Sequence, residues 1–275
     1  MSDYKLLDSG NLKKLEKIGP YTISRPAFNA VWQAKLDEAI YNGADLVFTR
    51  GKNSIWKTKS KIDTWQISVD DVLLKLKLTD FGHIGFFPEH LFLCKKIKNY
   101  LKNKNDLNIL NLFAYTGMAT CFAAKSGAKV THVDASKPSI LWAKENSQLN
   151  NISTNSVRWI LDDAMKFMRR EVKRGSKYDG IILDPPSFGR GAKGEIFNIE
   201  ESIFELLELC KKSLKDDFLF LIFSCHTPGF TKVVMENLMD GILDKKTDLF
   251  IDEMTIPSDT GLNLPSGFYA IWENL

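Results

Sequence analysis

The sequence lacks the cysteine and histidine patterns that metal sites and disulfide frameworks require. Its four cysteines, Cys94, Cys121, Cys210 and Cys225, lie far apart, and the 275 residues include only four histidines. There is no C-x-x-C pair and no histidine spacing typical of zinc ligation, which disfavours a zinc site. We therefore expect reduced thiols and no bound metal.

Long apolar runs are absent as well. The apolar stretch at residues 72–78 is interrupted by lysines, and no segment approaches the length that crosses a membrane. The N-terminus is too polar for a signal peptide, so we expect a cytoplasmic protein. Length and composition fit one large domain, or a domain with a smaller appendage, and leave the oligomeric state open.

Net charge is a modest +3, but it is unevenly distributed along the chain. Residues 1–61 contain 11 Lys and Arg against 6 Asp and Glu, so this segment carries +5 and the remainder −2. With Trp32, Trp56 and Trp65 in or beside it, the segment has the composition to follow a phosphate backbone and stack on bases. A solvated basic face over core tryptophans is the equally weighted alternative.

The organisation of the chain changes near Pro88. Before it, residues 65–69 and 74–78 alternate apolar and polar side chains around an Asp70-Asp71 turn, which predicts a hairpin in a small β-rich subdomain. After it, apolar residues at 91, 94, 97 and 101 have helical spacing. Strands are then predicted at 108–113, 130–134, 157–161, 180–183 and 218–224, and helices at 118–125, 138–150, 164–174, 199–213 and 231–239.

This alternation of strands and helices is typical of a doubly wound parallel sheet. Two further strands near 249–254 and 268–272 have no helix between them, which favours a terminal hairpin. Ligands of such sheets bind at the carboxyl ends of the strands, so the strand ends are the places to search for a site.

The first strand runs into a turn of small residues, 112–117, that opens a helix and contains one glycine. Because this turn carries neither the G-x-G-x-x-G dinucleotide motif nor the phosphate-binding loop, NAD and nucleoside triphosphates are disfavoured there. The second strand ends at Asp134, an acid placed to accept hydrogen bonds from ribose hydroxyls. The third ends at Asp162 and Asp163, where one carboxylate can cap the next helix and the other can accept from an adenine amino group.

The fourth strand delivers Asp184 into two prolines, a serine and Phe188. Prolines donate no backbone N–H, so the carboxylate and the nearby carbonyls remain as acceptors for a planar amine or a nucleobase. Phe188 is placed to stack on that plane. Any one of these acids alone is more often a helix cap or part of a solvated turn, and Asp-Pro-Pro alone also fits a simple strand end. Four strand ends in the expected order favour a binding site.

Five runs together resemble class I S-adenosylmethionine-dependent methyltransferases, and more specifically the bacterial large-subunit rRNA methyltransferases that act on cytosine C5 and on guanine. These runs are residues 82–90, 110–117, 131–137, 159–164 and 184–195. The resemblance implies a Rossmann-like, doubly wound, mostly parallel seven-stranded sheet in residues 88–275 that binds the cofactor. Residues 1–87 would form the β-rich subdomain that recruits substrate, since no separate RNA-binding module is recognisable.

The resemblance also implies roles for individual residues. The turn after the first strand would wrap the amino-acid portion of S-adenosylmethionine, Asp134 its ribose, and Asp163, or less directly Asp162, its adenine. The residues assigned to the cofactor are Asn111, Phe113, Ala114, Tyr115, Thr116, Gly117, Asp134, Ala135, Ser136, Asp162, Asp163, Ala164 and Asp184. Those assigned to catalysis are Asp184, Pro185, Pro186, Phe188 and Cys225.

Cys225, which closes the fifth strand, bears on the choice of acceptor atom. Cytosine C5 is a weak nucleophile, so enzymes that methylate it add a thiolate to C6. Cys225 is placed near Asp184 for this, with His226 beside it. A buried cysteine that acts as a small hydrophobe is the alternative, and transfer to a ring or exocyclic nitrogen then remains open.

Residues 189–194 contain three glycines with Arg190 and Lys193. Ser187, Arg190 and Lys193 are assigned to substrate binding, with the two cations placed to meet substrate phosphates on a flexible loop. A mobile solvated loop is the alternative. We therefore expect a methyltransferase with RNA, most directly rRNA, as substrate. A small-molecule or protein methyltransferase, or a noncatalytic cofactor-binding module, is the competing hypothesis.

Overall fold

The computed structural model describes residues 2–51, 54–190, 194–243 and 248–274. The chain forms two compact units, which we call the N-terminal unit, Met1–Leu91 with Met254–Ser266, and the C-terminal unit, Phe92–Glu253 with Gly267–Leu275. The sequence placed the boundary at residue 88 and assigned everything after it to one domain. By contacts within the chain, the N-terminal unit extends to Leu91 and includes the ends of the last two strands, which pack on its core.

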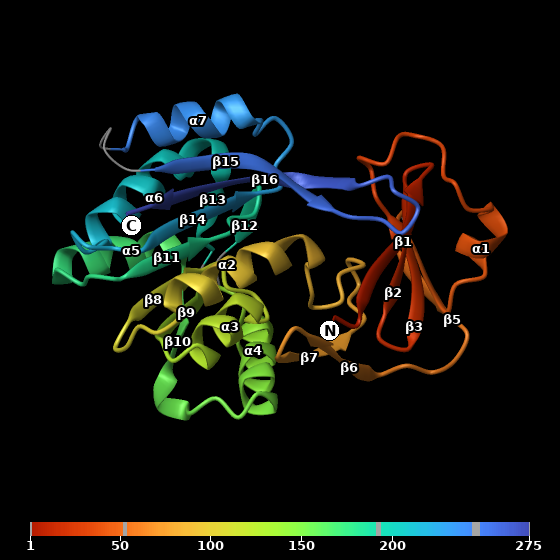
Figure 1. Ribbon diagram of the computed structural model, residues 1–275, viewed down its shortest axis with the longest axis horizontal. Coiled ribbons are helices and arrows are strands. Elements are labelled where there is room, and N and C mark those ends of the chain that lie inside the picture. Colours follow the sequence, from red (N-terminus) through yellow and green to blue (C-terminus); the bar gives the residue numbers. More distant parts are fainter. Residues whose placement is uncertain (1, 52–53, 191–193, 244–247, 275) are drawn as a thin grey trace. The chain divides into compact units, whose positions relative to one another are not determined.

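The N-terminal unit contains a five-stranded sheet in the order β1-β2-β3-β4-β5 (Figure 1). Residues 65–69 and 74–78 form the expected hairpin, β6 and β7, with Trp65 opposite Leu76 and Ile67 opposite Leu74. The elements are β1 Tyr4–Gly10, β2 Lys13–Ile18, β3 Tyr21–Pro26, α1 Glu38–Asn42, β4 Leu46–Thr49, β5 Ile55–Thr58, β6 Thr64–Val69, β7 Val72–Lys77 and the short 3-10 helix η1 Pro88–His90.

A buried ion pair joins neighbouring strands of the N-terminal sheet. Glu16 on β2 is fully buried and accepts from Arg25 on β3, with Nε–Oε2 2.8 Å and Nη2–Oε1 2.9 Å. Burial acts to raise the pKa of Glu16, but the charges of Arg25 and Lys14 outweigh it and hold the pKa below its usual range. Arg25 also donates through Nη1 to the carbonyl oxygen of Gly82, 3.1 Å away.

The C-terminal unit contains the seven-stranded sheet, in the order β10-β9-β8-β11-β14-β16-β15. Strands β10 to β14 in that order are parallel, and β16 is antiparallel to β14, which confirms the mostly parallel doubly wound fold. Its elements are α2 Leu91–Leu101, β8 Asn108–Leu112, α3 Met118–Lys125, β9 Lys129–Asp134, α4 Lys137–Leu149, η2 Thr154–Ser156, β10 Val157–Leu161, α5 Ala164–Arg174, β11 Gly180–Leu183, β12 Phe188–Arg190, β13 Ile196–Asn198, α6 Ile199–Ser213, β14 Phe220–Cys225, α7 Lys232–Asp240, β15 Leu249–Ile256 and β16 Leu264–Glu273.

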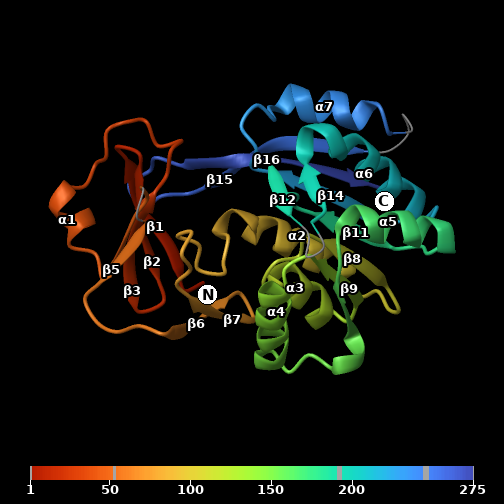
Figure 2. The same cartoon turned by 180° about the vertical axis from the view of Figure 1, so that it is seen from behind.

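Helices cover both faces of this sheet (Figures 1 and 2). Helices α5, α6 and α7 pack on one face through an apolar cluster that includes Leu221 and Phe223 of β14. On the other face, Tyr100 of α2 contacts Phe220, with 5.1 Å between ring centroids. Neighbouring residues of β14 therefore point to opposite faces, as the pleat of a strand requires. No helix in the described part of the chain is long and apolar enough to cross a membrane.

The predicted elements agree with this fold to within about two residues at most ends. The sequence did not predict the short hairpin of β12 and β13, whose strands have three residues each. Residues 189–194 were expected to be a flexible loop; Gly189 and Arg190 belong to β12, with Arg190 opposite Ile196, and residues 191–193 lie outside the described part.

Asp179 fixes the starting edge of the central strands. Its buried carboxylate accepts from the backbone N–H of Asn108 at 2.7 Å and from Lys215 Nζ at 2.7 Å. The backbone of Asp179 also forms hydrogen bonds with Asn108, the first residue of β8, and with Leu219, which directly precedes β14. One residue, through its side chain and its backbone, thus ties together the beginnings of three adjacent strands.

We expect Asp179→Ala to lower the free energy of unfolding by about 2 kcal/mol, because a buried N–H and a lysine lose their acceptor. Urea unfolding followed by circular dichroism measures the loss. The control is Asp217→Ala, which removes an exposed acid nearby and should cost less than about 0.5 kcal/mol. Equal losses in the two variants would contradict the assigned role.

Candidate functional site

Polar residues gather where parallel strands of the C-terminal sheet end side by side. Strands β10, β9, β8 and β11 are consecutive neighbours, and their carboxyl ends lie at one edge. The polar residues that follow these strands therefore meet at this edge, as expected from the sequence. They are the turn after β8, Asp134 at the end of β9, Asp162 and Asp163 after β10, and Asp184 after β11.

The turn after β8 is bent into a tight loop with unusual backbone angles. Phe113 and Tyr115 have φ of 54° and 49°, and Gly117 has φ of 82°. A Cβ atom on Gly117 would lie 3.0 Å from the Cβ of Ala143 on α4, so both the left-handed angle and the close approach favour glycine. Ala114 donates to the carbonyl of Val133 at 3.1 Å, which holds the loop against β9.

Asp134 joins this loop to the start of α4. Its Oδ2 accepts from the backbone N–H of Tyr115 and its Oδ1 from that of Ser136, both at 2.8 Å. Burial raises the pKa of Asp134, and the two N–H donors partly oppose that rise. Ser136 in turn caps α4 by accepting from Ser139 N. Each Asp134 oxygen keeps capacity for a further donor, such as a ribose hydroxyl.

A buried polar network lies beneath the loop. Asn111 Nδ2 donates to Thr120 Oγ1 at 3.0 Å, and the same oxygen lies 2.9 Å from His132 Nδ1. Burial lowers the pKa of His132 to about 3, so the imidazole is neutral. Asn111 was expected to contact the cofactor, and its amide nitrogen donates to this network. Sequence reasoning missed Thr120 and His132, because their partners lie on other elements and local patterns do not show them.

The two acids after β10 have different partners. Asp163 is the N-cap of α5, with Oδ1 accepting from Lys166 N at 2.9 Å. Asp162 accepts from the N–H of Asp163 at 2.9 Å and forms an ion pair with Arg170. Helix capping by one of these acids was predicted, and the structure assigns it to Asp163. Ala164 is the first residue of α5.

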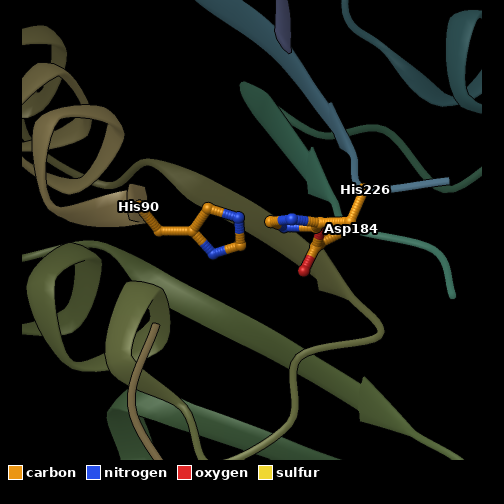
Figure 3. A group of neighbouring side chains, drawn as sticks. All are labelled: His90, Asp184 and His226. Atoms are coloured by element: carbon orange, nitrogen blue, oxygen red, sulfur yellow. The ribbon is translucent and has the colours of Figure 1, made fainter. Parts of the chain in front are cut away.

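Asp184 is oriented from β14, the neighbouring strand. Ser224 Oγ donates to Asp184 Oδ1 at 2.7 Å, and His226 Nε2 lies 3.6 Å from the same oxygen. Figure 3 shows the His226 imidazole directly beside the Asp184 carboxylate. A second pair, Ser187 Oγ and Thr227 Oγ1 at 2.7 Å, links the same two chain segments. The sequence identified Asp184 and Ser187, but it gave no signal for Ser224 or Thr227 as their partners.

Cys225 is buried in the core, although besides burial the charge of Asp184 still acts on its thiol and helps to raise the pKa. Its side chain is 1% exposed and belongs to the apolar cluster with Phe223 and Phe230. Burial raises the pKa of the thiol, and hydrogen bonding with Thr227 offsets only part of that rise. These observations favour the alternative in which Cys225 is a small core residue over the one in which it is a nucleophile.

The hairpin of β12 and β13 presents an aromatic ring and a cation beside the end of β11. Phe188 is 55% exposed, and the guanidinium carbon of Arg190 lies 5.8 Å from its ring centroid. Pro185 is buried, whereas Pro186 and Ser187 are exposed. Phe188 therefore has the open ring that stacking requires. Lys193, expected to meet phosphates, lies outside the described residues.

Comparisons with known proteins agree with this geometry. A model of the S-adenosylmethionine-dependent methyltransferase family matches residues 38–209. The crystal structure of an S-adenosylmethionine-dependent methyltransferase from Agrobacterium tumefaciens is 36% identical, covering 98% of this chain and 90% of that one, with a TM-score of 0.94. The chain belongs to the S-adenosylmethionine-dependent methyltransferase family, whose cofactor is S-adenosylmethionine.

Curated relatives also include proteins named ribosomal RNA large subunit methyltransferase K/L. The one from Pseudoalteromonas translucida is 37% identical over 158 residues, which are 57% of this chain and 21% of the relative. The one from Photobacterium profundum is 32% identical over 216 residues, 78% of this chain and 29% of the relative. The chain thus spans about a quarter of the length of these relatives.

If Asp163 reads the adenine, Asp163→Ser should weaken S-adenosylmethionine binding about tenfold without melting α5, because serine keeps the cap but lacks the second carboxylate oxygen. Isothermal titration calorimetry measures the affinity and thermal unfolding checks the fold. Asp37→Ser, the same change at the N-cap of α1, is the matched control and should leave affinity unchanged. Wild-type affinity in Asp163→Ser would show that the acid serves only as a cap.

Proposed function

We propose that this chain transfers a methyl group from S-adenosylmethionine to a base of RNA, most directly ribosomal RNA, and that the acceptor is a base nitrogen. The observation that carries the choice of atom is the burial of Cys225 at the end of β14. Ser224 bonds to Asp184, whereas Cys225 is buried in the core. A C5 mechanism needs a thiolate at the base, and a buried thiol with a raised pKa does not supply one.

The residues at the sheet edge fit the proposed cofactor. The carboxylate of Asp134 keeps acceptor capacity beside two backbone donors, which suits ribose hydroxyls, and the adjoining Ala135 and Ser136 would lie beside it. The close-packed turn from Phe113 to Gly117 lets a ligand approach the backbone. When bound, S-adenosylmethionine supplies a methyl group on a sulfonium, an activated donor that asks little further chemistry of the protein.

The protein's own contribution is to position the acceptor and its proton. Asp184 and the proline carbonyls would accept hydrogen bonds from a base amine, since Pro185 and Pro186 donate none. An exocyclic amine loses a proton when it is methylated, and Asp184 Oδ1, with His226 Nε2 3.6 Å away, is placed to receive it. Phe188 would stack on the base and Arg190 would meet a phosphate.

Two observations support RNA as the substrate class. The named curated relatives are ribosomal RNA methyltransferases, and residues 1–61 carry an excess of five positive charges. The expected cytoplasmic location of the protein is part of the same proposal.

Transfer of labelled methyl groups from S-adenosylmethionine to ribosomal RNA tests the function. We expect Asp184→Ala to lower kcat by about 100-fold or more, because the acceptor loses its positioning carboxylate. Asp106→Ala, which removes an exposed acid elsewhere in the unit, is the matched control and should keep full activity. Label in protein or small molecules but not in RNA would contradict the RNA assignment.

The acceptor atom has its own test in Cys225→Ala. A core cysteine that plays no chemical part should leave the transfer rate within about twofold of wild type. Mass spectrometry of nucleosides from the labelled RNA should then identify a nitrogen-methylated base. The opposite result, 5-methylcytidine that disappears in Cys225→Ala, would restore the thiolate mechanism.

A further inference from the structure

A pocket lies within the N-terminal unit. Strands β2, β3 and β4 and the segment 81–89 line it, and its volume is about 210 Å³. That is below the roughly 300–1,000 Å³ of sites that enclose a whole drug-sized ligand. A pocket of this size suits one group of a larger molecule.

The pocket is built around a glycine that the backbone requires. Gly82 has φ of +81°, and a Cβ there would lie 2.4 Å from the ring of Phe48. Arg25, held by Glu16, donates to the carbonyl of Gly82, and Thr79 accepts from Gly82 N at 3.0 Å. The loop is therefore fixed onto the sheet and the pocket is preformed.

Aromatic rings line the pocket at two depths. Phe48 and Phe86 are buried, 5% and 2% exposed, whereas Phe28 and Phe81 are 58% and 73% exposed. Two exposed rings that line the same pocket offer an apolar surface that a partner can cover. The sequence had pointed to tryptophans, but Trp65 is buried and the indoles of Trp32 and Trp56 donate to backbone carbonyls.

Positive charge accompanies these rings. Lys14, Arg25 and Arg50 line the pocket together with one acid, Glu89. Behind them Glu16 pairs with both Lys14 and Arg25, so the three cations outnumber the two acids by one. The guanidinium carbon of Arg50 lies 5.6 Å from the ring centroid of Phe28, so cation and stacking surface adjoin. Partial burial first, and then the charges of Arg25, Arg50 and Lys14, lower the pKa of His83 in the same lining, which is consistent with a positive local field.

We propose that this pocket binds one unstacked nucleotide of a single-stranded RNA segment, with the base against Phe28 and Phe81 and a phosphate at Arg50 and Lys14. Exposed rings beside cations are the combination by which proteins hold single strands. The proposal rests on the proposed RNA function and adds a contact site outside the methyl-transfer site.

Fluorescence anisotropy with a labelled single-stranded RNA oligonucleotide of mixed sequence, titrated with the full chain without S-adenosylmethionine, tests the proposal. Phe28→Ala and Phe81→Ala should each weaken binding about fivefold to a hundredfold. Arg50→Ala should also reduce the slope of log affinity against log salt by about 0.7, whereas the phenylalanine variants should not change that slope.

Phe250 and Lys96 offer a matched control pair. Phe250 is 50% exposed and Lys96 Nζ lies 5.8 Å from its ring centroid, but neither residue lines the pocket. Phe250→Ala and Lys96→Ala should bind the oligonucleotide like wild type. Equal loss in this pair and in the pocket variants would overturn the proposal, as would wild-type affinity in Phe28→Ala and Phe81→Ala.

Two further outcomes separate this proposal from the proposed function. Pocket-dependent oligonucleotide binding without any methyl transfer to RNA would support the pocket and contradict the function. If the pocket variants transfer methyl groups to ribosomal RNA with unchanged KM and bind the oligonucleotide like wild type, the function is supported and the pocket proposal is contradicted. Polyglutamate can be added as a competitor for the same pocket. If Phe28→Ala and Phe81→Ala weaken polyglutamate binding as strongly as RNA binding, the partner is an acidic protein and the assignment to RNA is overturned.

Discussion

The carboxylate of Asp134 is the interaction on which the cofactor edge depends. It accepts one backbone N–H from the loop after β8 and one from the turn after β9, so it ties two strand ends to each other. Phe113 and Tyr115 occupy left-handed backbone angles that such residues seldom adopt, and they persist because surrounding bonds determine them. The neutral network of Asn111, Thr120 and His132 supports the loop from below without adding a charge. The site is thus shaped before any ligand binds.

The pleat of β14 imposes a second constraint. Neighbouring side chains on a strand point to opposite faces, so Ser224 and Cys225 lie on different sides of β14. Ser224 orients Asp184, and Cys225 joins the core with Phe223 and Phe230. The proposal of transfer to a base nitrogen, in place of transfer through a thiolate adduct, therefore rests on the burial of one residue at the end of this strand.

Much of the fold was predictable because its signals are local. The helices at Ala164–Arg174 and Ile199–Ser213 have strong apolar periodicity and were predicted to the residue. The hairpin of β6 and β7 was predicted from its alternation around Asp70, whose φ is 57°. The hairpin of β12 and β13 was missed because strands of three residues carry too few positions to show a period. The N-terminal unit was predicted only as β-rich, since its five-stranded order depends on pairings between distant segments.

The sequence by itself determined the fold class and the acids at the strand ends, because hydrophobic periodicity fixes the strands and parallel strands bring their carboxyl ends to one edge. Only the tertiary structure decided which of these groups are already occupied. Asp163 caps a helix, Asn111 belongs to a buried network, and Cys225 lies in the core. The pocket of Phe28, Arg50 and Phe81 likewise has no local signature. Burial and hydrogen-bond partners come from residues far apart in the chain, and local patterns do not record which of them meet.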